Sequence, residues 1–188
     1  MENKKTLVWI IGGVVVGAVI VYFAVSGGLS IPGVQGPVSG VQTPEGTVMA
    51  PGASPISDAG QVVTPSGKPV QQDVMPGSPD APQQSGSIAE TSVPASAVKL
   101  EISSAGFSPS EFTVDAGDPV VLSLTSTDGK THVFYFNDPE LQAVALGVGP
   151  NETRLIPFNA PAKAGEYAFH CDVPGHAARG EVGKMVVK

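Results

Sequence analysis

Apolar and polar residues alternate in short runs from Ala97 to Lys188. Alternation with a period of two, in runs rich in β-branched and aromatic residues, is typical of β-strands that bury one face. Gly, Pro, Asp and Asn residues lie between the runs, where they favour turns. The pattern predicts seven strands, over residues 98–102, 112–114, 120–124, 132–136, 153–156, 167–170 and 184–187.

Seven short strands separated by turns predict an all-β domain over residues 97–188, built as an antiparallel sandwich or barrel. One helical turn is expected at Asp138, because Pro139 follows at a helix start and Gly147 lies beyond the end. The domain is too short for a doubly wound nucleotide-binding fold or a β/α barrel. We therefore expect a single compact module with one core.

Residues 26–96 have a different composition. Gly, Pro and Ser make up 33 of these 71 residues, and no aromatic residue is among them. A segment without large apolar side chains buries too little surface to offset the entropy of ordering its backbone. The composition therefore predicts a disordered or extended linker over residues 26–96.

An uncharged apolar run of 19 residues, 7–25, precedes this linker. Its length is close to the roughly 20 residues with which a helix crosses a bilayer. Two lysines lie before the run and the next basic residue is Lys68, so the positive-inside rule places residues 1–6 in the cytoplasm. The alternative is a signal peptide cleaved near residues 24–26, although the run is longer than a usual signal core. Both readings place the all-β domain on the extracytoplasmic (periplasmic or extracellular) side of the cell membrane.

The chain carries 10 basic and 17 acidic residues, a formal net charge of −7. The sequence has no clustered basic stripe, so no nucleic acid is expected as a partner. The single cysteine, Cys171, cannot form an intramolecular disulfide bond. The core or a metal ion therefore has to stabilise the domain.

Cys171 begins the most informative stretch of the sequence, Cys-Asp-Val-Pro-Gly-His, which ends at His176. Both residues lie on one predicted loop, and His132 starts an earlier strand. A lone cysteine is usually a small buried apolar residue, and a lone histidine is usually hydrogen-bonded and structural. Together, one thiolate and two imidazoles are the trigonal donor set of mononuclear copper electron-transfer sites, which a weak axial ligand completes.

The Cys-x-x-Pro-Gly-His loop before a terminal Gly-Lys-x-Val-Val-Lys strand resembles the cupredoxins, the family of blue copper proteins, and among them the rusticyanin type of loop. The resemblance covers residues 97–188. It implies a Greek-key β-sandwich and one copper ion that cycles between Cu(II) and Cu(I). It also implies that His132, Cys171 and His176 are the three equatorial ligands, and that redox proteins of the cytochrome or oxidase type dock near His176.

The sequence departs from this family pattern at the axial position. The rusticyanin type of loop has a methionine five residues after its second histidine, and this chain has Glu181 there. We expect Glu181 to be the axial ligand, to favour Cu(II) and to lower the reduction potential, because a carboxylate is a harder donor than a thioether. Such a site need not be blue, since the red copper cupredoxin nitrosocyanin has a carboxylate ligand. The alternatives are that Glu181 turns to solvent, or that Met185, expected in the core, replaces it.

The expected function is therefore that of a membrane-tethered electron carrier, and not of an enzyme. His170 precedes Cys171 and is expected on the opposite face of its strand, behind the site or at the surface. Two other functions stay open. The first is a copper site that binds or converts nitric oxide, peroxide or superoxide at an open coordination position, and the second is copper storage or delivery.

Overall fold

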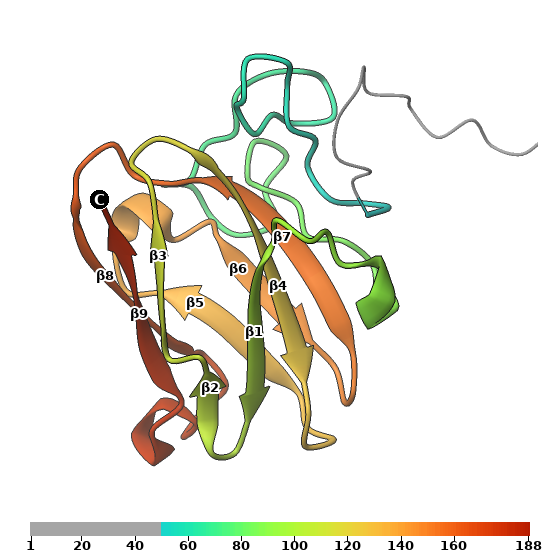
Figure 1. Ribbon diagram of the computed structural model, residues 1–188, viewed down its shortest axis with the longest axis vertical. Helices are drawn as coiled ribbons and strands as arrows, with labels where there is room; N and C mark the ends of the chain where they lie inside the picture. The colour runs from blue at the N-terminus through green and yellow to red at the C-terminus, as the bar shows by residue number, and fades with distance from the viewer. Residues whose placement is uncertain (1–49) are drawn as a thin grey trace, which may run out of the picture. The chain divides into compact units, whose positions relative to one another are not determined.

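The computed structural model describes residues 50–188, drawn in colour in Figure 1. The predicted membrane helix, residues 7–25, and the first part of the predicted linker, residues 26–49, lie outside this part of the chain and stay predictions. Among the described residues, no helical segment has the length and apolar character needed to span a bilayer.

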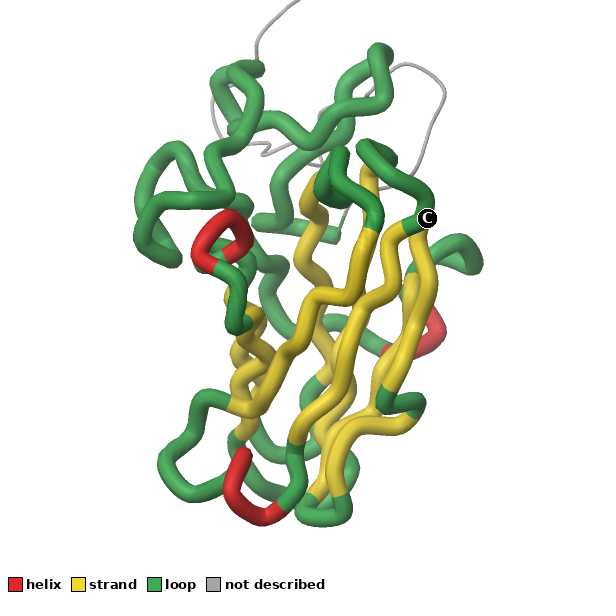
Figure 2. Tube along the Cα trace, turned by 90° about the vertical axis from the view of Figure 1, so that its left-hand side faces the viewer, coloured by secondary structure: helices red, strands yellow, loops and turns green. Residues whose placement is uncertain are grey.

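Two β-sheets form a sandwich, and the loops gather at the two ends of the strands (Figures 1 and 2). One sheet has the order β2 (Gly106–Ser108), β1 (Val98–Ser103), β4 (Pro119–Ser126), β7 (Thr153–Asn159). The other has the order β3 (Glu111–Val114), β9 (Val182–Val187), β8 (Gly165–Cys171), β5 (His132–Phe136), β6 (Ala145–Val148). All seven predicted strands are confirmed. The alternation pattern did not predict β2 and β6, which have three and four residues.

The expectation of purely antiparallel pairing is wrong for two pairs of strands. β1 pairs with β4 in parallel, and β3 pairs with β9 in parallel. The chain passes repeatedly from one sheet to the other, so these neighbours in space are not neighbours in sequence. Crossover connections of this kind allow parallel pairing, which a two-residue hairpin cannot.

The predicted helical turn at Asp138 is confirmed. The 3-10 turn η2 spans Pro139–Leu141, and the Asp138 carboxylate accepts a hydrogen bond from the Glu140 backbone N–H at 2.9 Å. An aspartate before a proline satisfies one of the free N–H groups at a helix start, which explains why this local signal could be read from the sequence.

Aromatic rings fill the space between the sheets. The ring centroids of Phe134 on β5 and Phe169 on β8 are 4.7 Å apart, and Phe107 meets Phe169 edge to face at 5.0 Å. Because side chains alternate along a strand, His132 at the start of β5 shares the buried face with Phe134 and Phe136. The packed rings therefore hold β5 and β8 in one register at the buried face.

Residues 50–96, called the edge segment below, form turns and isolated bridges beside β7, coloured cyan to green in Figure 1. Val62 and Ala81 are fully buried in it, and Ser54 is buried as well. The prediction of a disordered linker is therefore wrong for residues 50–96. These residues belong to the folded domain.

Hydrogen bonds to the two outermost strands explain why the edge segment is ordered. The Ser85 backbone N–H donates to Leu155 O at 2.8 Å, and the Leu155 N–H donates to Ser85 Oγ at 2.9 Å. On the other sheet, the Gly147 N–H of β6 donates to Gln84 Oε1 at 2.9 Å. The edge segment thus satisfies backbone groups that an open sandwich edge would leave to solvent.

A small second core lies under the edge segment. Leu155 and Val121 point to the outer face of the first sheet and are buried against Val93, with Ile56 and Ile88 packed beside them. These apolar residues are scattered among Gly, Pro and Ser, so the average composition of the stretch did not indicate a core. Their partner is a sheet face far away in the sequence, which a local pattern does not reveal.

Candidate metal centre

The pairing of β5 with β8 brings His132 and Cys171 together. The two strands are antiparallel neighbours, and Phe134 lies opposite Cys171 in the register. The first residue of β5 and the last residue of β8 therefore lie at the same end of the sandwich, the lower end in Figure 1.

The loop of residues 172–181 brings the other two predicted ligands to this end. It folds back on itself, and the Cys171 N–H donates to Glu181 O at 2.9 Å. The 3-10 turn η3 (Ala177–Arg179) follows His176 and ends at Gly180, whose φ of 99° is left-handed and favours glycine. The loop is thereby closed on itself before β9 begins.

Four donor atoms, one from each predicted ligand, lie within 4.8 Å of one another. Glu181 Oε2 is 2.9 Å from His132 Nδ1 and 2.8 Å from His176 Nδ1. Cys171 Sγ is 3.8 Å from His132 Nδ1 and 3.5 Å from His176 Nδ1. All four residues are buried. Within residues 50–188 this is the one cluster of His, Cys, Asp and Glu that could hold a metal ion.

The donor chemistry of this cluster fits copper. A soft sulfur, two imidazole nitrogens and one carboxylate oxygen converge, and each offers an electron pair. Sulfur and imidazole donors suit both oxidation states of copper, whereas magnesium and calcium prefer oxygen donors alone. Burying a carboxylate beside a thiolate is unfavourable unless a cation compensates their charges.

The environment of Cys171 favours the thiol when no cation is bound. Burial raises the pKa of Cys171, and the nearby Glu181 carboxylate raises it further. The Val133 backbone N–H donates to Cys171 Sγ at 3.4 Å and works in the opposite direction. A metal ion therefore has to displace a proton from this sulfur, as metals do from cysteine ligands generally.

Glu181 is held as a carboxylate and points into the cluster. Its residue exposure is 0%, which contradicts the alternative that it turns to solvent. Burial opposes the charged form, but hydrogen bonds from His176, Arg179 and His132 outweigh it and lower the pKa of Glu181. Arg179 Nη2 donates to Glu181 Oε1 at 3.1 Å, so Oε1 is occupied and Oε2 faces the two histidines.

Met185 and His170, which neighbour the predicted ligands in the sequence, lie outside the donor cluster. Met185 is fully buried in the main core, opposite Tyr167, which lies four residues before Cys171 on β8. His170 lies on the outer face of its strand, as the alternation predicts, where Nδ1 contacts Asn137 Oδ1 and Nε2 lies 3.5 Å from Asp172 Oδ1. Neither residue reaches the donor cluster.

Two contacts around the cluster were not predicted from the sequence. One is the Arg179 guanidinium on Glu181, and the other is Asp128, whose Oδ1 lies 3.0 Å from His132 Nε2. Asp128 is four residues before His132 in a turn at Gly129, and this spacing is the one local signal that could have indicated it. The contact depends on how the β4–β5 loop folds.

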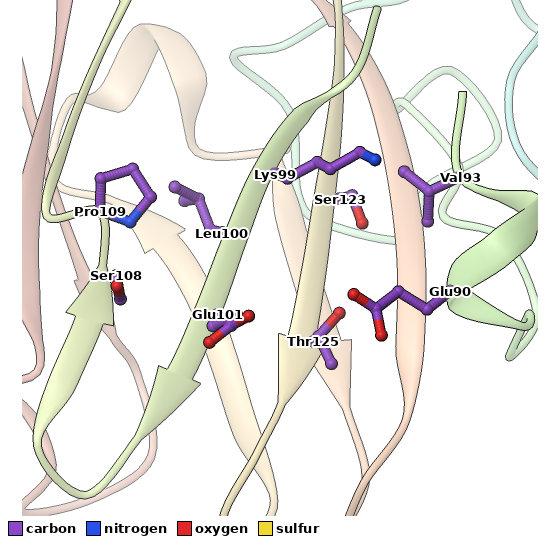
Figure 3. Close-up of a pocket in the computed structure, with 9 residues that line it drawn as sticks. All are labelled: Glu90, Val93, Lys99, Leu100, Glu101, Ser108, Pro109, Ser123 and Thr125. Carbon is purple, nitrogen blue, oxygen red and sulfur yellow. The ribbon is translucent and has the colours of Figure 1, made fainter. Parts of the chain in front are cut away.

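A separate hollow lies on the outer face of the first sheet (Figure 3). It is lined by Glu90, Val93, Lys99, Leu100, Glu101, Ser108, Pro109, Ser123 and Thr125. Its charged side chains point in different directions and do not converge on one point (Figure 3). The donor cluster is therefore the stronger candidate for a functional site.

The fold and the cluster together define a β-sandwich protein with one buried site for a soft metal. The family model of the cupredoxin-like domain matches residues 83–187, more than half of the chain, so the protein belongs to the cupredoxin family. Copper is the cofactor of this family, whose members typically carry electrons. The match begins within the edge segment, which agrees with the folded state of those residues.

Three solved structures illustrate the likeness. Auracyanin from Roseiflexus castenholzii is 25% identical, with a TM-score of 0.43, and the match covers 50% of this chain and 98% of that one. Auracyanin A from Chloroflexus aurantiacus, a "blue" copper protein, is 25% identical, with a TM-score of 0.40 and coverage of 49% and 98%. A reduced mutant of amicyanin with one tryptophan replaced by tyrosine is 22% identical, with a TM-score of 0.40 and coverage of 55% and 92%. No curated protein matches the chain significantly.

Proposed function

We propose that this protein carries single electrons on one copper ion held by His132, Cys171, His176 and Glu181. The observation that carries the proposal is the position of Glu181 Oε2, which lies 2.9 and 2.8 Å from the Nδ1 atoms of the two histidines while fully buried. A copper ion bound there would supply one-electron chemistry between Cu(II) and Cu(I).

Each of the four residues has a distinct part in this proposal. Cys171 supplies the soft thiolate, which couples the site electronically to the protein. His132 is completely buried, whereas the His176 side chain is 11% exposed and forms the route for electrons to the surface. Glu181 would supply a hard, anionic donor, which would lower the reduction potential.

The surrounding structure supports a site that changes little between oxidation states. His132 and Cys171 lie on paired strands of the core. The His176 N–H donates to Val173 O at 3.0 Å, and the Glu181 N–H donates to His176 O at 3.3 Å. Donors held by strands and a closed loop need little rearrangement during electron transfer.

We further propose that the domain is tethered to the membrane by residues 7–25 and works on the extracytoplasmic side with redox protein partners that dock near His176. The support is the apolar run, the preceding lysines and the partial exposure of the His176 side chain, 11%. Residues 26–49, the Gly-, Pro- and Ser-rich stretch between the apolar run and the described residues, would serve as the tether. Protease treatment of intact spheroplasts is expected to cleave the copper domain; protection from protease would contradict this orientation.

The proposed ligand set is tested by loading the purified full chain with Cu(II) and recording optical and EPR spectra. We expect one copper per chain and a thiolate absorption band. An intense blue band with narrow copper hyperfine splitting would contradict ligation by Glu181, and the absence of a thiolate band would contradict the whole site. A spectrum that changes on addition of nitric oxide, peroxide or superoxide would instead favour ligand binding at an open coordination position.

The role of Glu181 is tested by Glu181→Met. A neutral thioether stabilises Cu(II) less than a carboxylate does, so the reduction potential should rise and the spectrum should become bluer. The rise is about 59 mV for each factor of ten by which Cu(II) binding weakens more than Cu(I) binding. Met185→Leu is the matched control, because Met185 lies in the core, and it should leave the potential unchanged.

A further inference from the structure

Asp128 lies on the loop between β4 and β5, and hydrogen-bond donors from this loop and from other elements surround its carboxyl group. Its Oδ2 accepts from the Ser104 backbone N–H at 2.8 Å and from the Ser104 hydroxyl at 2.6 Å. Its Oδ1 lies 3.2 Å from the Lys130 N–H, a donor, and 3.0 Å from His132 Nε2. An ionised carboxylate has about four acceptor sites and no donor, and this environment uses all of them.

Donors other than His132 already face both oxygens of this carboxyl group. The Ser104 N–H and hydroxyl point at Oδ2, and the Lys130 N–H points at Oδ1. Asp128 therefore acts as an acceptor only and carries a negative charge beside the buried His132 ring.

An acceptor on one side of a histidine determines which ring nitrogen carries the proton. Because Asp128 Oδ1 can only accept, Nε2 of His132 has to donate, and a neutral ring then has a lone pair on Nδ1. That lone pair points at Glu181 Oε2, 2.9 Å away, and into the group of four donors. At this distance a proton or a metal ion lies between the two atoms, so a metal ion that binds Nδ1 takes the place of a proton.

We propose that Asp128 is a positioning residue of the metal site. Its carboxylate keeps the proton of His132 on Nε2, leaves Nδ1 free to bind the metal, and adds a negative charge that favours the oxidised metal. This inference rests on the proposed function, since it concerns the same copper site. Carboxylates that accept from the second nitrogen of a metal-bound histidine fix the ring and make it a stronger donor.

The charges near the ring agree with this role. His132 is 0% exposed, while the side chain of Asp128 is 19% exposed, so their contact is largely shielded from water. Lys130 forms an ion pair with Asp128: its Nζ lies 4.0 Å from Oδ2, and its side chain is 55% exposed. Solvent screens such an exposed pair, so Lys130 offsets only part of the Asp128 charge.

The experiment measures Cu(II) affinity, Cu(I) affinity and reduction potential for the full chain and for Asp128→Asn. An amide can accept on one side only, so it loses either the Ser104 or the His132 hydrogen bond, and it has no charge. We expect Cu(II) binding to weaken about 10–100-fold. We expect Cu(I) binding to weaken about tenfold less, which raises the potential by about 59 mV. Unchanged affinities would overturn the positioning role, and equal losses in both oxidation states would overturn the effect of charge.

Two further variants separate this inference from general damage to the fold. Asp138→Asn makes the same change after the other end of β5, where Asp138 caps the start of η2. It should leave the reduction potential unchanged. Lys130→Gln removes the neighbouring cation and should lower the potential at low ionic strength. If Asp128→Asn does not fold, Lys130→Gln tests the effect of charge in its place. A reduction potential that rises or stays unchanged in Lys130→Gln would overturn that effect. Failure of the unmodified chain to bind copper with a thiolate band would instead overturn the proposed function.

Discussion

The β8–β9 loop and the edge segment are both poor in large apolar residues and rich in small ones, yet different forces hold them. The loop of residues 172–181 is held by its own backbone hydrogen bonds and by polar contacts around Glu181. The edge segment is held by hydrogen bonds to β6 and β7 and by scattered apolar side chains on the outer face of β7. The first region therefore concentrates donors for a metal, and the second completes the fold.

Whether a Gly- and Pro-rich segment folds therefore depends on the surface that it packs against. If this difference is correct, changes in the loop, or at Cys171 directly before it, should alter the metal site with little effect on stability. Changes in or under the edge segment should lower stability with little effect on the metal site. Four substitutions test this separation, in order of decreasing effect.

Cys171→Ser should have the largest effect. A serine hydroxyl is a hard and weak donor, so the thiolate band should disappear and Cu(I) affinity should fall on the order of 100-fold or more. Optical titration measures both. The free energy of unfolding of the metal-free chain should change by less than about 2 kcal/mol, because the substitution is nearly isosteric. A retained thiolate band would contradict the proposed site.

Leu155→Ala should destabilise the fold and spare the metal site. Leu155 is fully buried on the outer face of β7, under the edge segment. Removing its side chain should lower the free energy of unfolding by about 2–5 kcal/mol, measured by chemical denaturation. Ile156→Ala, on the inner face, is the matched control and should cost a similar amount. A cost below about 0.5 kcal/mol for Leu155→Ala would mean that the edge segment does not cover this face.

Asn159→Ala should have a smaller effect in the same direction. Asn159 Oδ1 accepts a hydrogen bond from the Val62 backbone N–H at 2.9 Å, and Val62 is fully buried. The substitution leaves this N–H without its partner, which should cost about 1–3 kcal/mol. Hydrogen exchange of the Val62 amide localises the effect: it should be slow in the unmodified chain and fast in the variant. A variant as stable as the unmodified chain would show that this bond does not hold the edge segment.

Arg179→Gln should have the smallest effect, on the metal site alone. The guanidinium donates to Glu181 Oε1 and withdraws charge from that carboxylate, but its side chain is 47% exposed and partly screened. Its loss should make Glu181 a stronger donor for Cu(II) and lower the potential by less than about 59 mV. Voltammetry at two salt concentrations measures the shift, which should shrink at high salt. A rise in potential would contradict this contact.

The strands could be predicted because alternation is a local property. All seven predicted runs are strands, and the missed strands β2 and β6 are short runs without a clear alternation. The parallel pairs could not be predicted, since the partner of a strand is chosen by the path of the chain between the sheets.

The donor cluster could be predicted in part. Cys171 and His176 lie in one local motif, and the resemblance to the cupredoxins pointed to His132 and Glu181. The burial of Glu181, its contact with Arg179 and the contact of Asp128 with His132 depend on how two loops meet. Such contacts join residues from different strands and loops, so no spacing in the sequence reports them.

Composition and near neighbours along the chain specify seven of the strands, the charge balance, the single cysteine and the residue types of the metal site. The tertiary structure alone decided that residues 50–96 are folded, that four donors converge and that Asp128 faces His132. The physical reason is that burial and convergence are properties of surfaces brought together by the core. A side chain far along the chain can then supply the partner that local composition lacks.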